Sequence, residues 1–157
     1  MANILAIEAS SDICSVALSC GQGTFERISD LPKSHSNSLL PMIDAIFAEA
    51  GLKLSELDAI AYGEGPGSFT GLRICLSVAQ GLAYAADLPL VSVSCLGAIL
   101  RVANQQLALP ETYRAFAVVD ARMQELYWCC QDVSPNKVRT VAEVQLGGFD
   151  SVSAQVK

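Results

Sequence analysis

Short apolar runs separated by polar turns at the start of the chain predict three short strands. Residues 3–9 and 13–20 are apolar runs of strand length, and the turn between them at 10–12 is Ser-Ser-Asp. A Gly-Gln-Gly turn then leads into a third candidate strand at 24–31. Consecutive strands joined by short turns predict an antiparallel meander.

Two helices with apolar faces are predicted next. Apolar residues recur at helical spacing over about 36–50, and Gly51 follows in the usual C-terminal position. If Ser38 is the N-cap, Pro41 falls in the first turn, where proline is tolerated. The second helix, about 72–86, is rich in small and apolar residues and has few charges, so we expect both of its faces to be covered.

The rest of the chain predicts further strands and one more helix. Further strands are predicted at Ala59–Tyr62, Leu90–Val93, Ala115–Val119, Glu125–Gln131 and Lys137–Leu146. Ser94 is a suitable cap for a third helix that reaches about Gln106. We therefore expect an α/β chain with an N-terminal lobe at 1–106 and the start of a second lobe at 107–157.

Composition narrows the class of protein. With 52 % apolar and 17 % charged residues, the chain suits a packed core. It has no apolar run of the ~18 residues that a membrane span needs, and its first residues do not resemble a signal peptide. The net charge of −6 argues against direct binding of nucleic acid. The six cysteines lack a Cys-x-x-Cys spacing, so we expect reduced thiols in a cytoplasmic protein.

The glycine-rich segment at 63–71 lies between a predicted strand and a predicted helix. Its backbone N–H groups and the helix N-terminus are placed to meet an anion such as a nucleotide phosphate, and the candidate residues are Gly65, Gly67 and Ser68. The segment is neither a Walker A loop nor a dinucleotide fingerprint, since Thr70 occupies the third glycine position. Close packing of a helix on a strand explains the glycines equally well, and both interpretations stay open.

The first predicted hairpin turn is a second, weaker candidate. Glu8, Ser10 and Ser11 offer a carboxylate and two hydroxyls that suit a phosphate or a magnesium-bound water. His35 is the only histidine, and Leu39 stands four residues later, so we expect no metal site. No Gly-x-Ser-x-Gly elbow is present, and we expect no catalytic residue.

Several motifs together resemble the bacterial TsaB family, also called YeaZ. The most specific is residues 62–73, Tyr-Gly-Glu-Gly-Pro-Gly-Ser-Phe-Thr-Gly-Leu-Arg, followed by Ala-Gln-Gly-Leu-Ala at 79–83. The opening Ile-Leu-Ala-Ile-Glu at 4–8, the segment from His35 to Ile43 and the Asp-Ala-Arg-Met at 120–123 agree as well. The resemblance covers most of the chain.

The resemblance implies a fold and a function. The fold would be the actin, Hsp70 and sugar-kinase (ribonuclease H-like) superfold, with a mixed sheet, flanking helices and an incomplete second lobe, because TsaB chains are longer. The function would be that of a non-catalytic subunit in making threonylcarbamoyladenosine beside the tRNA anticodon. Its partners would be the catalytic paralogue TsaD and the ATPase TsaE, with a homodimer as the competing state and tRNA reached only through the complex.

The family pattern also implies where the partner docks. Pairing through the first two helices gives an expected interface of Leu39, Leu40, Ile43, Ile46, Phe47, Ile74, Cys75, Val78 and Leu82. Glu8-Ala9 stands where TsaB chains usually have Asp-Thr, so no cofactor is expected to be required, and ATP or ADP is only weakly supported. The alternatives are an ATP-dependent kinase or ATPase of the same superfold and, last, a glycoprotease-like peptidase.

Overall fold

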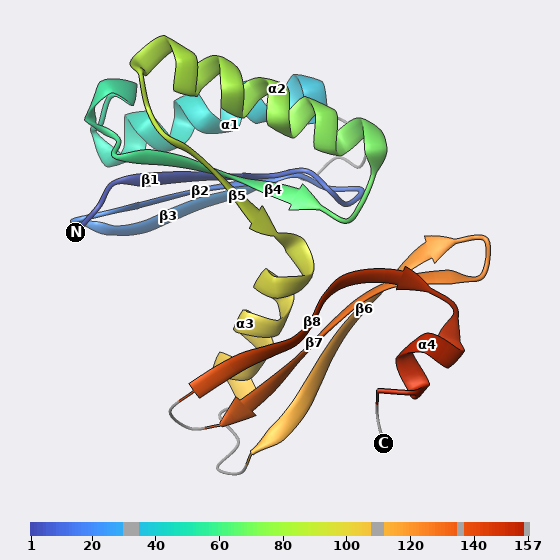
Figure 1. The fold of residues 1–157 in the computed structure, drawn as a ribbon. Helices are drawn as coiled ribbons and strands as arrows, with labels where there is room; N and C mark the ends of the chain where they lie inside the picture. Colours follow the sequence, from blue (N-terminus) through green and yellow to red (C-terminus); the bar gives the residue numbers. More distant parts are fainter. Residues whose placement is uncertain (30–34, 108–111, 135–136, 156–157) are drawn as a thin grey trace. The chain divides into compact units, whose positions relative to one another are not determined.

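The computed structural model describes residues 1–29, 35–107, 112–134 and 137–155, which form two compact units, Met1–Val93 and Ser94–Lys157 (Figure 1). The first unit runs β1, β2, β3, α1, a short 3-10 helix, β4, α2 and β5. Their bounds are β1 Ile4–Glu8, β2 Ser15–Cys20, β3 Gly23–Ile28, α1 His35–Ala50, the 3-10 helix Leu54–Glu56, β4 Ala59–Gly65, α2 Phe69–Ala86 and β5 Leu90–Ser94.

The first unit is built on a mixed five-stranded sheet in the order β3-β2-β1-β4-β5. The predicted meander is confirmed, because β1 pairs antiparallel with β2 and β2 pairs antiparallel with β3. β4 then joins the other edge of β1 in parallel, with Leu5 opposite Ile60. A parallel neighbour requires a crossover connection, and α1 lies within that connection.

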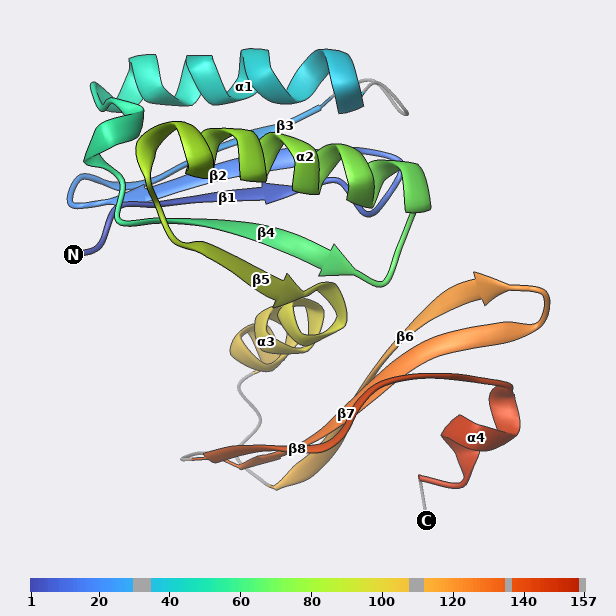
Figure 2. The same cartoon turned by 45° about the horizontal axis from the view of Figure 1, so that its top comes forward.

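Both long helices cover the same face of this sheet (Figure 2). Leu5 and Ile7 of β1 alternate with less buried residues, and they share a core with Leu39 and Ile46 of α1 and Cys75 of α2. Leu5, Leu39, Ile46 and Cys75 are fully buried. Each large side chain buried here contributes about 1.5–3 kcal/mol to folding before entropy is counted, so this interior holds both helices on the sheet.

The helix ends follow local sequence signals in most places. Ser68 caps α2, since its hydroxyl accepts the Gly71 N–H at 3.3 Å, and Gly51, with φ +64°, follows α1. The helix predicted over about 36–50 is confirmed, since α1 spans His35–Ala50; Ser38 is not its cap, because it lies inside the helix, as does Pro41. The His35 ring at the start of α1 is buried, and its Nε2 lies 3.0 Å from the Ser11 carbonyl oxygen.

The second unit is a three-stranded antiparallel sheet in the order β6-β7-β8 with α3 on one face. Its bounds are α3 Cys95–Leu107, β6 Tyr113–Arg122, β7 Glu125–Ser134, β8 Lys137–Gly147 and a short α4 Phe149–Ser153. Leu96 and Leu100 of α3 pack against Ala117 and Cys129 of the sheet. The predicted cap of α3 is confirmed by the 3.2 Å hydrogen bond from Gly97 N–H to the Ser94 hydroxyl.

The boundary between the two units lies before α3, whereas the sequence analysis placed it after this helix. The sequence placed the boundary after residue 106, whereas the first unit ends at Val93. The reason is that the buried face of α3 belongs to the core it shares with β6 and β7. Residues 108–111 of the predicted second lobe lie outside the described residues.

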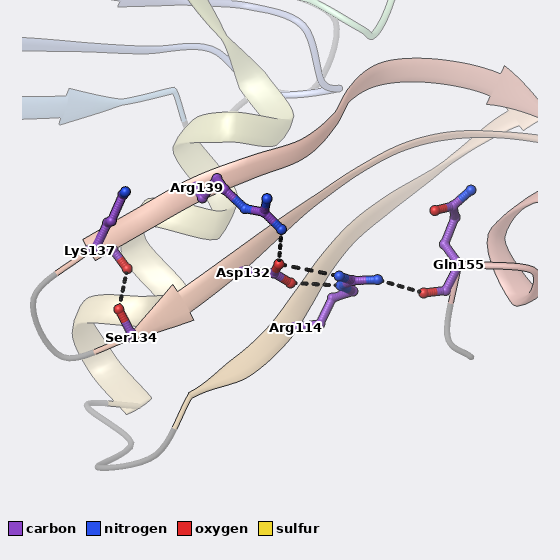
Figure 3. Close-up of polar contacts among 6 residues, drawn as sticks. All are labelled: Arg114, Asp132, Ser134, Lys137, Arg139 and Gln155. Atoms are coloured by element: carbon purple, nitrogen blue, oxygen red, sulfur yellow. Dashed lines mark hydrogen bonds and ion pairs between the residues drawn. The ribbon is translucent and has the colours of Figure 1, made fainter.

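One carboxylate links all three strands of the second sheet (Figure 3). Asp132 of β7 accepts hydrogen bonds from Arg114 of β6 at 2.7 and 3.2 Å and from Arg139 of β8 at 2.8 Å. The three residues face one another in the strand register. The bond from Arg114, followed by that from Arg139, lowers the pKa of Asp132 to about 2.

Two further properties concern the whole described chain. No helix within the described residues is long and apolar enough to cross a membrane. All six cysteines are buried, and none of them forms a disulfide.

We predict that the second sheet loses stability in acid through Asp132. The pKa of Asp132 is lower in the folded state than the value of about 3.9 in an unfolded chain. Its contribution is therefore complete above about pH 4 and is lost as the pH falls towards about 2. At pH 7 in low salt, Asp132→Asn should lower the melting temperature measured by circular dichroism, and the gap to the unmodified chain should close by pH 2.

The control is Glu143→Gln, which removes an exposed carboxylate from β8 that has no ion pair among the described residues. It should leave the melting temperature nearly unchanged at both pH values. A gap for Asp132→Asn that is equally large at pH 7 and pH 2 would contradict the ionic role of this residue.

Candidate functional site

The turn between β1 and β2 meets the N-terminus of α2, and this contact brings the two predicted anion-binding motifs together. The Ser68 N–H donates to the Ser10 carbonyl oxygen at 2.7 Å. The Ser10 N–H donates to the carboxylate of Glu8. We call this set, Glu8, Ser10, Ser11, Gly67 and Ser68, the hairpin–helix junction. The sequence predicted each motif separately and gave no sign that they touch.

Two glycines are required at the junction by the closeness of the backbones. A Cβ on Gly71 would lie 1.9 Å from the Ala9 carbonyl oxygen, and one on Gly67 would lie 2.3 Å from that of Ser10. Gly65 is constrained differently, since its φ is +100° and a Cβ there would meet Leu72 at 3.0 Å. The close-packing interpretation of the glycine-rich segment therefore has a direct structural basis.

His35 is part of the same region, which the sequence did not indicate. Its ring is 6 % exposed and lies against Gly71, and its Nε2 is 3.0 Å from the Ser11 carbonyl oxygen. A carbonyl only accepts, so Nε2–H is the donor. The buried Nδ1 has no hydrogen-bond partner among the described residues. The imidazole thus ties the start of α1 to the first turn.

The junction has limited capacity for ligand chemistry. At the N-terminus of α2, the Ser68 and Gly71 N–H groups are already used within the protein. No group of three or more His, Cys, Asp or Glu side chains among the described residues is arranged to hold a metal ion. Binding of an anion or nucleotide by Glu8, Ser10, Ser11, Gly65, Gly67 and Ser68 stays a prediction.

The residues expected at the partner interface fall into groups that differ in how far their side chains are buried. Leu39, Ile43, Ile46 and Cys75 are at most 2 % exposed and belong to the core under the helices. For these four the expectation of a surface position is wrong, because their side chains hold α1 and α2 on the sheet. Phe47, Ile74, Val78 and Leu82 are partly buried against the same core, and Leu40 is 50 % exposed.

A different face of α2 is exposed, and the sequence analysis missed it. Its residues follow one another at helical spacing opposite the buried Gly71, Cys75, Ala79 and Ala83. They are Phe69, Arg73, Ser77, Gly81 and Tyr84, which we call the α2 outer face. Tyr84 is 92 % and Phe69 67 % exposed, which is unusual for aromatic side chains of a globular domain. In the sequence, the signal for this face was that Phe69 and Tyr84 fall outside the apolar stripe of the helix.

The side chains of the α2 outer face are suited to contact another protein. The Arg73 guanidinium lies 3.9 Å from the centre of the Phe69 ring, a cation–π arrangement that holds both side chains in place. Ser77 and Gly81 have little or no side chain, and space is open above Gly81. A helix can therefore approach closely between the two aromatic residues.

Residues 29–155 match the family described as "TsaD: tRNA N6-adenosine threonylcarbamoyltransferase". A protein of Haemophilus influenzae named "tRNA threonylcarbamoyladenosine biosynthesis protein TsaB" is 43 % identical over 138 residues, which are 87 % of this chain and 56 % of that protein. The protein of the same name from Escherichia coli is 43 % identical over 126 residues, or 80 % of this chain and 53 % of its own length. The chain thus spans little more than half the length of these relatives.

A solved structure named "YeaZ from Pseudomonas aeruginosa" is similar in fold. It superposes with a TM-score of 0.83 at 38 % identity, over 93 % of this chain and 67 % of the solved chain. The match therefore includes both units of the present structure.

We predict that Gly71→Ala destabilises the first unit. The added methyl cannot fit beside the Ala9 carbonyl, and forcing α2 away from the hairpin should cost about 1–3 kcal/mol or more of unfolding free energy. The matched control is Gly81→Ala in the same helix, where nothing lies within 4 Å of the new carbon. That change should raise the unfolding free energy by about 0.5–1 kcal/mol. Equal effects of the two substitutions in urea unfolding would contradict the close-approach argument.

Proposed function

The chain belongs to the TsaB (YeaZ) family, and from this premise we propose that it acts in tRNA threonylcarbamoyladenosine biosynthesis as a non-catalytic partner subunit. The structure and its similarity to YeaZ confirm the expected α/β fold with a mixed sheet and flanking helices, and we propose that it is of the actin, Hsp70 and sugar-kinase superfold that the family resemblance implies. Because the chain covers little more than half of its relatives, the activity, substrates and partners of the whole protein are part of the proposal.

The proposed partner is the paralogue TsaD, with the ATPase TsaE in the same assembly. The matched family is described by the name of the transferase itself, so the chain and TsaD share a common framework. Two related folds can pair through equivalent helices. A second copy of this chain would compete for the same surface, which makes the homodimer the alternative state.

The observation that carries the proposal is the α2 outer face. Tyr, Phe and Arg are enriched in the energetically dominant centres of interfaces, and here all three occur on one exposed helix. Leu40 of α1 adds a further exposed apolar side chain. By contrast, charge introduced at Ile43 or Cys75 would enter the core and unfold the unit, so these positions cannot report on pairing.

The environment of His35 supports a non-catalytic role. The only histidine of the chain is enclosed between the first turn and α2, and its Nε2 is engaged with a backbone carbonyl. Leu39, one helical turn later, is fully buried, so the helix offers an aliphatic side chain where a paired-histidine metal site needs a second ligand.

Charge supports the proposal that tRNA is held by another subunit. Residues 1–93 contain four Lys and Arg against ten Asp and Glu, whereas residues 94–157 contain six of each kind. The unit that carries the α2 outer face therefore repels a phosphate backbone. Six buried cysteines, none in a disulfide, fit a reducing compartment, and we propose the cytoplasm.

We further propose that the chain itself requires no nucleotide. Within the hairpin–helix junction, the Ser68 N–H is bound to Ser10 and the Ser10 N–H to Glu8, so these groups are directed at each other. A phosphate would have to replace these internal hydrogen bonds. This argues against the ATPase alternative for the chain in isolation.

We predict that Tyr84→Glu or Phe69→Glu weakens the complex with TsaD of the same organism. Truncating or charging an aromatic residue at the centre of an interface costs about 2 kcal/mol or more, so the dissociation constant should rise by at least about 30-fold. Analytical ultracentrifugation of the mixed proteins measures it. Because both side chains are exposed, circular dichroism should show an unchanged melting temperature.

The matched control is Phe149→Glu, the same chemical change at an aromatic residue that is 74 % exposed in the second unit. It should leave the dissociation constant within about twofold. If Tyr84→Glu and Phe69→Glu bind TsaD as tightly as the control, the α2 outer face is not the docking surface. Loss of tRNA modification in a reconstituted reaction should accompany the loss of pairing.

A second prediction concerns nucleotide. Isothermal titration of the isolated chain with magnesium-ATP should show no saturable heat in the micromolar range, because the junction donates its hydrogen bonds internally. Micromolar binding that is abolished by Glu8→Gln would contradict this expectation and favour the ATPase alternative.

A further inference from the structure

The second unit contains a pocket of about 330 Å³ between α3 and the sheet. Its lining comes from one side of α3 and from neighbouring positions on β7 and β8. The lining residues are Gly97, Arg101, Asn104, Gln105, Gln131, Val133 and Val138. The volume lies at the lower end of the range for small-molecule sites, roughly 300–1,000 Å³. This pocket is in a different unit from the α2 outer face.

The described lining of the pocket carries a positive charge and no negative one. Among the described residues, the lining contains one guanidinium and three carboxamides but no carboxylate. Asp132 is the neighbour of Gln131 in β7, yet successive side chains of a strand point to opposite faces, and Asp132 is bound to Arg114 and Arg139. Among the described residues, Arg101 has no ion pair. Within the described lining, no carboxylate balances its positive charge.

The orientation of one carboxamide is fixed by a neighbour. The Tyr113 hydroxyl donates to Oδ1 of Asn104 at 3.2 Å, which directs the acceptor side of this amide to the tyrosine. Its NH₂ group is then left to donate elsewhere. Arg101, Gln105 and Gln131 add further N–H donors to the lining of the pocket.

Two features restrict the kind of anion that the pocket can bind: its location at the end of α3 and its two valines. Asn104 and Gln105 lie in the last turn of α3, where the helix carbonyl ends disfavour a multiply charged group. A single carboxylate matches the two parallel N–H donors of a guanidinium. It is also repelled less by the negative end of the helix than phosphate is. Val133, which is 7 % exposed, and Val138 give an apolar wall for a short hydrocarbon group.

We propose that this pocket binds a small monocarboxylate that carries an aliphatic group, with Arg101 pairing with the carboxylate and the carboxamides of Asn104, Gln105 and Gln131 donating to it. The site is independent of the proposed pairing with TsaD. The matching ligand is an acid of the size of isobutyrate or a small aliphatic amino acid.

The test is a titration of the ¹⁵N-labelled chain with isobutyrate, followed by nuclear magnetic resonance. The side-chain signals of Arg101, Asn104, Gln105 and Gln131 report on the site directly. They should shift together and saturate in the millimolar range. Isobutyramide, which has the same shape and no charge, should bind at least tenfold more weakly, and inorganic phosphate should bind more weakly as well.

Arg101→Gln should weaken isobutyrate binding at least tenfold, whereas Arg122→Gln, an exposed arginine of the same unit outside the pocket, should leave it unchanged. Backbone spectra of both variants establish that the unit is folded. The proposal is overturned if the four side chains show no saturable shift up to 100 mM, if Arg101→Gln binds as well as the unmodified chain, or if phosphate binds more tightly than isobutyrate.

Discussion

The structure of the first unit depends on two stretches of backbone that lie closer together than any side chain would permit. Ala9 and Ser10 of the first turn contact Gly67 and Gly71 at the start of α2. The hydrogen bond from Ser68 N–H to Ser10 closes this contact. It sets the position of α2 over β4 and β1, and the core under the helix follows from that position.

The same contact explains why the aromatic residues of α2 are exposed. With Gly71 fixed against the hairpin, Cys75, Ala79 and Ala83 must follow on the buried side at helical spacing. Small residues on this side let the helix lie close to the sheet. Phe69, Arg73 and Tyr84 then point outward, although two of them are aromatic. Exposed apolar surface of this kind is typical of contact sites for another protein.

Much of the fold could be predicted from local patterns. Apolar runs between turn residues located the meander, and Ser94 and Gly51 mark helix ends whose chemistry is local. The proposed docking surface, the α2 outer face, was missed in the sequence analysis. Helical periodicity shows that Leu39, Ile43 and Ile46 form one stripe, but it does not show whether the chain's own sheet or a partner covers that stripe. The contact of His35 with a turn that is distant in the sequence escaped prediction, because periodicity does not show which separate segments meet.

The central strand β7 serves two purposes on its two faces. Cys129 contributes to the core with α3, and Gln131 and Val133 line the pocket beside it, while Asp132 on the reverse joins the arginines of both neighbouring strands. A shift of one residue in its register would place a carboxylate beneath the helix and leave two guanidinium groups without a counter-ion. Insertions or deletions of a single residue within β7 should therefore be eliminated by selection. Insertions or deletions confined to the hairpin ends leave each side chain of β7 on its own face of the sheet.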